Sequence, residues 1–203
     1  VQSALNAINS SGGGGLKLTG PGSLLVKAPL QIYNNTRFYG DPARSPYGMV
    51  LVGDNRTSSC SSGGTFRHGN CPIIIVTDQN AYSADNVTIW NIHFDGSRSG
   101  YPLSAPAVSV VRSTGVVIIY AKINGARTGG VSIRQSAGTN IKYLSLDMAR
   151  STSGEPEGGA GVWIAQSTGT VLENSLIEGK PYYDAGLPVS DPNSSAGAAP
   201  TMD

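Results

Sequence analysis

The segment Asn86-Val-Thr-Ile-Trp-Asn-Ile-His-Phe-Asp-Gly96 indicates the architecture of the chain, because related segments recur along it. The copies occupy residues 115–125, 140–150 and 169–179. Aligned position for position, they bring four residues into one column at spacings of 29, 25 and 29 residues: Asn91, Tyr120, Ser145 and Asn174. Repeats of this length are typical of solenoids, in which each repeat forms one coil.

Each copy contains two short strands joined by a bend. In the first copy Val87, Ile89, Ile92 and Phe94 alternate with Thr88, Trp90, His93 and Asp95, so one set faces inward and the other outward. The bend falls at Asn91, whose short amide can bond the local backbone. A looser, earlier copy is predicted to bend at Asn35, with Thr36, Phe38 and Gly40 in the places of Ile92, Phe94 and Gly96.

A third strand precedes each of the last three copies, over residues 107–115, 130–138 and 161–169. Its predicted inward columns are Val108, Val131 and Val162, and Val110, Ile133 and Ile164. Three strands per coil predict an all-β fold, a right-handed parallel β-helix forming a three-sided solenoid. A propeller would need longer antiparallel blades, and a sandwich would not repeat one motif in register.

Composition narrows the classes of partner. The 203 residues are 39% hydrophobic and only 13% charged, with 27 glycines and a formal net charge of +1. Because the net charge is close to zero, the protein has no strong overall electrostatic attraction for nucleic acid or for an anionic membrane. No apolar run is long enough to span a bilayer. A neutral surface rich in hydroxyls and amides suits a polysaccharide or other glycan, although the turns of a solenoid alone would require the same residues.

The two cysteines, Cys60 and Cys71, flank a flexible ten-residue segment. We predict a disulfide, which implies an oxidising compartment. Metal binding would need more ligands than these thiols and His68 provide, and no motif supports Ca²⁺, so no metal and no cofactor is expected. Glycosylation sequons begin at Asn9, Asn34, Asn55, Asn86 and Asn193, as many as chance could supply in so polar a chain.

The N-terminal third resembles the start of pectate-lyase-like β-helix proteins. Residues 1–10 have the apolar spacing of a short helix, and a glycine run (Gly12–Gly15) leads into 16–26. The resemblance implies that this helix caps a β-helix domain over residues 1–179. Residues 180–203 form a Pro-, Ala- and Ser-rich C-terminal segment, either irregular or the start of a truncated coil. The superfamily includes polysaccharide lyases, glycoside hydrolases, epimerases, tailspike depolymerases and non-catalytic adhesins, so fold does not fix activity.

Outward columns indicate where chemistry could occur. The column containing Trp90 is unusually apolar, which predicts either a cover by a loop or a second copy in a homo-oligomer, or sugar stacking on Trp90. On the next strand, the alignment makes His93, Lys122 and Asp147 stacked neighbours. Lys122 could then accept a proton, or merely form an exposed ion pair with Asp147.

The third-strand face is the one that the resemblance implies for saccharide binding. Loops 96–106, 125–129 and 150–160 vary in length and would bring four side chains toward Arg134 and Trp163: Tyr101, Arg127, Glu155 and Glu157. Arg134 could neutralise a uronate in a lyase. Glu155 and Glu157 could supply the two carboxyls of a hydrolase, or simply keep a glycine-rich loop soluble. Trp163 is the predicted glycan contact of this face.

Two functions follow as hypotheses. The first is an extracellular or virion-surface carbohydrate-active protein that cleaves a polysaccharide as a lyase or hydrolase. The second is a non-catalytic β-helix acting as a fibre, adhesin or glycan-binding module. Two carboxyls facing one groove would favour the enzyme.

Overall fold

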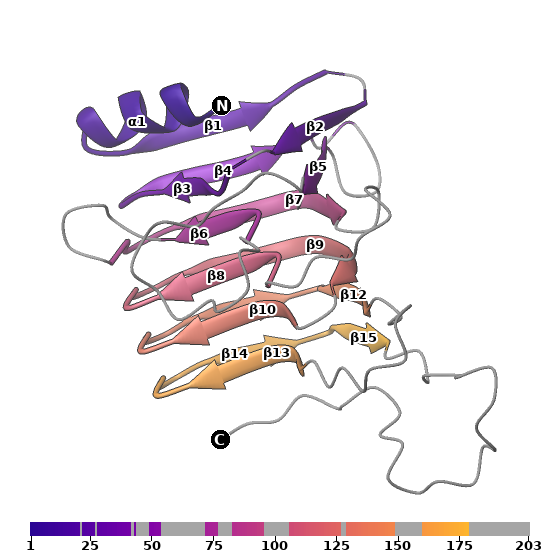
Figure 1. The fold of residues 1–203 in the computed structure, drawn as a ribbon. Coiled ribbons are helices and arrows are strands. Elements are labelled where there is room, and N and C mark those ends of the chain that lie inside the picture. The colour runs from indigo at the N-terminus through magenta and orange to yellow at the C-terminus, as the bar shows by residue number, and fades with distance from the viewer. Residues whose placement is uncertain are drawn as a thin grey trace, which may run out of the picture.

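A computed structural model gives the fold (Figure 1). It describes residues 1–20, 22–26, 28–41, 43, 49–53, 72–76, 83–95, 106–126, 129–148 and 160–178. One short helix is followed by parallel strands, in the order α1 (Gln2–Ser10), β1 (Gly14–Leu18), β2 (Ser23–Val26), β3 (Leu30–Ile32), β4 (Thr36–Gly40), β5 (Met49–Gly53), β6 (Ile74–Val76), β7 (Thr88–Asp95), β8 (Val108–Val111), β9 (Val117–Ala126), β10 (Gly129–Arg134), β11 (Asn140–Lys142), β12 (Ser145–Met148), β13 (Ala160–Ala165), β14 (Val171–Glu173) and β15 (Leu176–Glu178).

The strands form two sheets in which every pairing is parallel. Sheet B has the order β13-β10-β8-β6-β3. Sheet A has a first wing, β1-β4-β7-β9-β11-β14, and a second wing in which β2, β5, β7, β9, β12 and β15 pair in turn. β7 and β9 pass through both wings. The chain therefore runs from sheet B through the first wing to the second and back, and Figure 1 shows these coils stacked from α1 downward.

Left-handed backbone residues mark the corners of each coil. One corner contains Arg112, Gln135 and Gln166, and the corner between the wings contains Asn91, Tyr120, Tyr143 and Asn174, all with φ between 49° and 57°. A third column begins with Asn35 and Asn86 and continues with Gly115, Gly138 and Gly169, at φ between 54° and 67°. Asparagine and glycine tolerate this conformation best, so tyrosine at such a corner is unusual.

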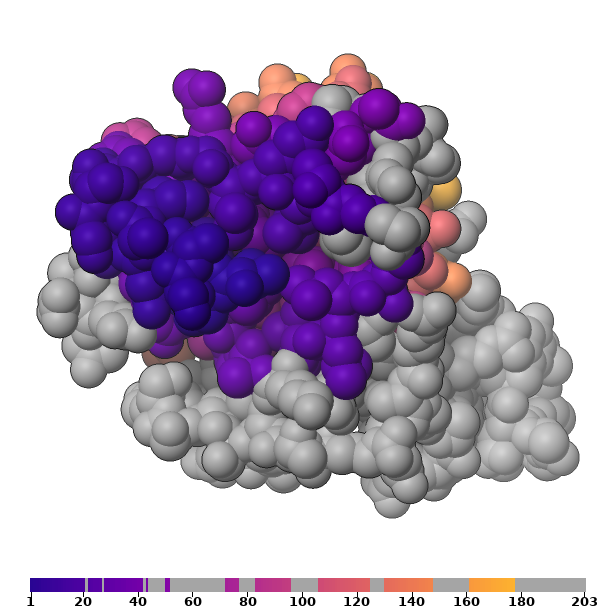
Figure 2. Space-filling view, turned by 90° about the horizontal axis from the view of Figure 1, so that it is seen from above, coloured from indigo at the N-terminus to yellow at the C-terminus, as the bar shows by residue number. Residues whose placement is uncertain are grey.

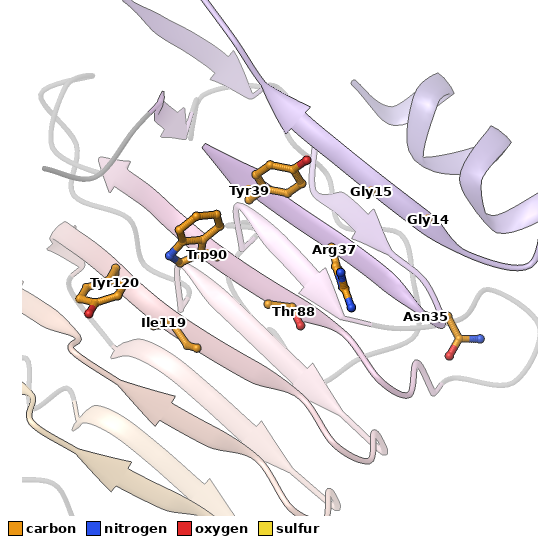
Figure 3. A pocket seen from close by; sticks show the side chains of 9 residues that line it. All are labelled: Gly14, Gly15, Asn35, Arg37, Tyr39, Thr88, Trp90, Ile119 and Tyr120. Carbon is orange, nitrogen blue, oxygen red and sulfur yellow. The ribbon is translucent and has the colours of Figure 1, made fainter. Parts of the chain in front are cut away.

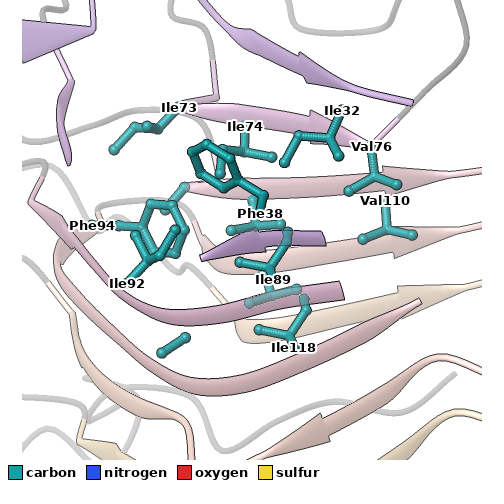
Figure 4. Close-up of a cluster of buried hydrophobic side chains, with 14 of the residues drawn as sticks. Ile32, Phe38, Ile73, Ile74, Val76, Ile89, Ile92, Phe94, Val110 and Ile118 are labelled. Carbon is teal, nitrogen blue, oxygen red and sulfur yellow. The ribbon is translucent and has the colours of Figure 1, made fainter. Parts of the chain in front are cut away.

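The interior is a continuous column of aliphatic side chains with two phenylalanines, Phe38 and Phe94 (Figure 4). Ile89, Ile118 and Ile141 pair in register in the first wing, and all three are fully buried. Leu5 of α1 is also fully buried, so the helix packs its apolar side onto this core. The sequence prediction of a short N-terminal helix is confirmed, as is the prediction of a mostly β fold with parallel strands.

Serine hydroxyls bond the backbone at the corner that contains Arg112, Gln135 and Gln166, one serine per coil. Ser136 Oγ accepts from Ser113 N–H at 3.1 Å and donates to the Arg134 carbonyl at 2.9 Å. Ser167 repeats both bonds one coil later, and Ser113 Oγ receives the Ala84 N–H one coil earlier. Each serine thus satisfies a backbone group that the turn leaves unpaired.

The structure corrects the alignment of the third copy by two residues. Asn140 pairs with Val117 and Ser145 with Lys122, so Tyr143 rather than Ser145 occupies the corner beside Tyr120. The true spacings between these corner residues are 29, 23 and 31 residues. Asp147 consequently pairs with Asn124 and does not lie directly beside Lys122 as predicted.

A second correction concerns the earlier copy. Arg37, Phe38 and Tyr39 pair with Thr88, Ile89 and Trp90. Phe38 is therefore the counterpart of Ile89, not of Phe94, and Asn35 belongs to the column of Asn86 rather than to the bend at Asn91. The third-strand columns of sheet B were predicted correctly: Val108, Val131 and Val162 pair in register, as do Val110, Ile133 and Ile164.

Candidate functional site

A groove of about 770 Å³ lies on the outer face of the first wing (Figure 3). Its lining residues come from β1, β4, β7 and β9 and from the turn before β4: Gly14, Gly15, Asn35, Arg37, Tyr39, Thr88, Trp90, Ile119 and Tyr120. The volume falls within the range of pockets that hold small ligands or a few sugar units.

Strand register explains why these residues meet. Arg37 pairs with Gly15 on one side and Thr88 on the other, while Tyr39 pairs with Trp90, which pairs with Ile119. Successive strands lie about 4.8 Å apart, and residues two apart on a strand share a face. The groove is thus the outward surface of β1, β4, β7 and β9, and glycine at position 15 leaves room beside the Tyr39 ring.

Aromatic rings dominate the groove. The rings of Tyr39 and Trp90 lie 5.9 Å apart, centroid to centroid, and are tilted by 30°. Tyr120 stacks on Tyr143 of the next coil, with centroids 4.7 Å apart and planes within 7° of parallel. Tyr120 and Tyr143 remain 46% and 42% exposed. Exposed aromatic faces with hydroxyl or indole N–H groups at their edges suit sugar rings, which combine apolar C–H faces with polar rims.

Charges around the groove are unevenly distributed. Arg37 is the one charged residue in the lining, and its side chain is exposed. Beyond the groove on either side, Lys17 Nζ lies 3.1 Å from Asp41 and Lys142 Nζ lies 2.8 Å from Glu173. The hydrogen bond to Glu173 raises the pKa of Lys142 above its ordinary value. These flanking pairs are electrically neutral, so the groove itself carries the positive charge of Arg37.

The second wing carries a separate polar cluster. His93 pairs with Lys122, and Asp95 pairs with Asn124, which pairs in turn with Asp147. Burial lowers the pKa of His93, the charge of Lys122 lowers it further, and Asp95 partly opposes them. Within the described part of the chain, His93 Nε2 and Asn124 Oδ1 are buried without a hydrogen-bond partner. Asp95 and Asp147 lie on either side of Asn124 in one outward column.

The outer face of sheet B differs from the prediction. Ser109 and Ser132, expected to face outward beside Trp163, are only 1% and 3% exposed. Trp163 pairs with Ser132 and is 41% exposed, and Arg134 lies two residues from Ser132 on the same face, half-buried. Arg134 and Trp163 are thus neighbours, as predicted, but on a different sheet from the groove.

The predicted site residues therefore divide into three groups. Trp90 lines the groove, whereas Lys122 lies in the second-wing cluster and Arg134 and Trp163 lie on sheet B. The others fall outside the described residues: Tyr101, Arg127, Glu155, Glu157, Cys60 and Cys71. Sequence reasoning missed Arg37, Tyr39 and Tyr120, and a correct alignment of residues 36–40 with 87–91 would have placed Tyr39 beside Trp90.

No group of three or more His, Cys, Asp and Glu side chains is arranged to hold a metal ion within the part of the chain that the structure describes. Among the helices described there, none has the length and apolar character needed to cross a membrane.

The fold is mostly β with parallel strands in a β-helix-like arrangement. No family model matches the sequence, and no curated protein matches it. Among solved structures, the chain is similar to a "putative glycosyl hydrolase" from Parabacteroides merdae ATCC 43184, with a TM-score of 0.63 and 16% identity, over 91% of this chain and 82% of that one. At such low identity the likeness is one of fold alone.

Proposed function

We propose that the protein is a carbohydrate-active, right-handed parallel β-helix of three faces that binds a polysaccharide in the groove of the first wing. The observation that carries this proposal is the aromatic lining of the groove, formed by the half-buried Tyr39 and Trp90 and the exposed Tyr120. The fold likeness to a glycosyl hydrolase supports a carbohydrate ligand at the level of class. A rigid sheet with few long side chains to immobilise is also a favourable platform for a long, flexible ligand.

Binding to a panel of soluble polysaccharides, measured by affinity electrophoresis and then calorimetry, tests the proposal. Trp90→Ala should weaken binding about tenfold or more, because it removes the largest ring of the groove. Trp163→Ala is the matched control, since it removes an exposed tryptophan from sheet B. Loss of binding in Trp163→Ala but not in Trp90→Ala would overturn the proposed site in favour of the sheet B face.

A second copy of the chain covering the Trp90 column is the competing hypothesis. Light scattering distinguishes it, because Trp90→Ala would then lower the mass in solution instead of the affinity for glycans. Such a result would contradict the groove as a glycan site.

Cleavage is the second candidate function, and the carboxyls of the second wing favour it. The backbones of Asp95 and Asp147 are two strand spacings apart along the column, roughly 9.6 Å, and rotation of the side chains toward each other would bring the carboxyl groups closer than that. Inverting glycoside hydrolases separate their general acid and base by roughly 6.5–9.5 Å. Hydrolysis would require one carboxyl to protonate the leaving oxygen and the other to activate a water.

A reducing-end assay on the polysaccharide that binds best tests hydrolysis, and absorbance of an unsaturated uronate tests the lyase alternative. Asp95→Asn and Asp147→Asn should each abolish hydrolysis while leaving binding to the groove intact. Unsaturated products that disappear in Arg134→Ala would instead support the lyase hypothesis. Binding without either product would make the protein a glycan-binding module.

We also propose an extracellular or virion-surface location, because the predicted disulfide implies an oxidising compartment. Mass spectrometry of the unreduced protein would detect that disulfide.

A further inference from the structure

We infer that the groove selects a glycan carrying an anionic group, a carboxylate or a sulfate ester, and that Arg37 binds that group. This inference rests on the proposed function and specifies its ligand. It assigns to Arg37 a role in recognition that is separate from the stacking role of the aromatic rings.

The position of Arg37 suits this role. Arg37 precedes Tyr39 by two residues on β4 and pairs with Thr88, which precedes Trp90 by two residues on β7. The four side chains therefore form a rectangle on one face, with the aromatic pair along one side and the guanidinium and hydroxyl along the other (Figure 3). Residues two apart are separated by about 6.6 Å along a strand. A sugar stacked on Trp90 would thus hold its substituents within reach of the long arginine side chain.

Local charge makes an anion the matching ligand. None of the nine lining residues is acidic. Lys17 and Lys142, at the two ends of the column that contains Tyr39 and Trp90, already have carboxylate partners at 3.1 and 2.8 Å. Within the described part of the chain no ion pair involves Arg37. The groove consequently presents one cation that a ligand can neutralise.

The chemistry of arginine narrows the ligand further. The planar guanidinium offers two parallel N–H donors that match two oxygens of a carboxylate or a sulfate, and such bonds are stronger than bonds between neutral groups. The Thr88 hydroxyl can donate to a remaining oxygen or bond a sugar hydroxyl. Gly14 and Gly15 leave the space beside these groups open.

Three polymers with one backbone test the inference: dextran, carboxymethyl-dextran and dextran sulfate. We expect the two charged forms to bind more tightly than dextran, and to lose this preference as salt is raised, because ions screen an exposed pair. Comparison of carboxymethyl-dextran with dextran sulfate distinguishes the two anions. Arg37→Ala should weaken binding of the preferred form about tenfold and leave dextran unaffected. Arg37→Lys should restore the charge but only part of the affinity.

Arg112→Ala is the matched control, since it removes an exposed arginine from the corner next to sheet B. Equal affinity for all three polymers, or equal losses in Arg37→Ala and Arg112→Ala, would overturn the inference. The proposed function would survive that outcome if Trp90→Ala still weakened binding in the polysaccharide panel. If no polysaccharide of the panel binds, both fail.

Discussion

Removing the hydroxyl of one corner serine, Ser136, should lower the free energy of unfolding measurably. In Ser136→Ala the Ser113 N–H loses its acceptor at 3.1 Å in a buried position, since Ser136 is only 4% exposed. The Arg134 carbonyl keeps a second donor, the Arg112 N–H at 2.9 Å. One buried, unsatisfied N–H is therefore created, at a cost of about 1–3 kcal/mol.

Urea denaturation followed by far-ultraviolet circular dichroism measures this cost as a lower midpoint with an unchanged slope. Ser167→Ala should cost less, because the Ser136 N–H, which donates to the Ser167 hydroxyl, lies in a partly buried site. Ser3→Ala on the exposed side of α1 is the control, with an expected change below about 0.5 kcal/mol. A midpoint for Ser136→Ala equal to that of the Ser3 control would refute the view that these hydroxyls hold the corner.

Three other predictions concern packing, the groove and pH. Gly161→Ala should cost about 1–3 kcal/mol in urea denaturation, because its new Cβ would lie 2.6 Å from Ile177 Cγ2. Tyr143→Ala should weaken glycan binding by releasing the ring of Tyr120, whereas Tyr143→Phe should not, and equal losses in the two variants would contradict a stacking role. Burial lowers the pKa of His93, so its imidazole binds a proton more tightly in the unfolded chain than in the folded one. The stability contributed by neutral His93 is therefore fully present above pH 6.5 and is lost as the pH falls through the lowered pKa. His93→Gln should flatten that dependence in melts at pH 5 to 7.

Sequence periodicity predicted the register of β8, β10 and β13 in sheet B correctly, because these three strands end in near-identical turns. Val108, Val131 and Val162 could be aligned on the glycines that follow them, at 115, 138 and 169. The same glycines were also the correct anchors for the first wing. Alignment on Asn140 instead of Gly138 produced the two-residue error there.

The corner between the wings could not be predicted as easily. Asparagine fits a left-handed corner at both Asn86 and Asn91, so its presence does not identify which corner is meant. Tyr143 adopts φ 54°, a conformation that no turn rule assigns to tyrosine. The misplacement of Asn35 in turn separated Tyr39 from Trp90 and hid the groove, although Trp90 itself was identified as a sugar-stacking candidate.

In the last three coils, variation in length is confined to one side of the molecule. The left-handed residues of their two corners are eight positions apart in every case (Arg112 and Tyr120, Gln135 and Tyr143, Gln166 and Asn174), so the passage from sheet B through the first wing has one length there. The difference among these three coils falls where the chain leaves the second wing for sheet B. Foreign peptides grafted between residues 148 and 160 should therefore leave the ligand-binding face intact, which makes that edge the natural place to engineer new specificities onto this scaffold.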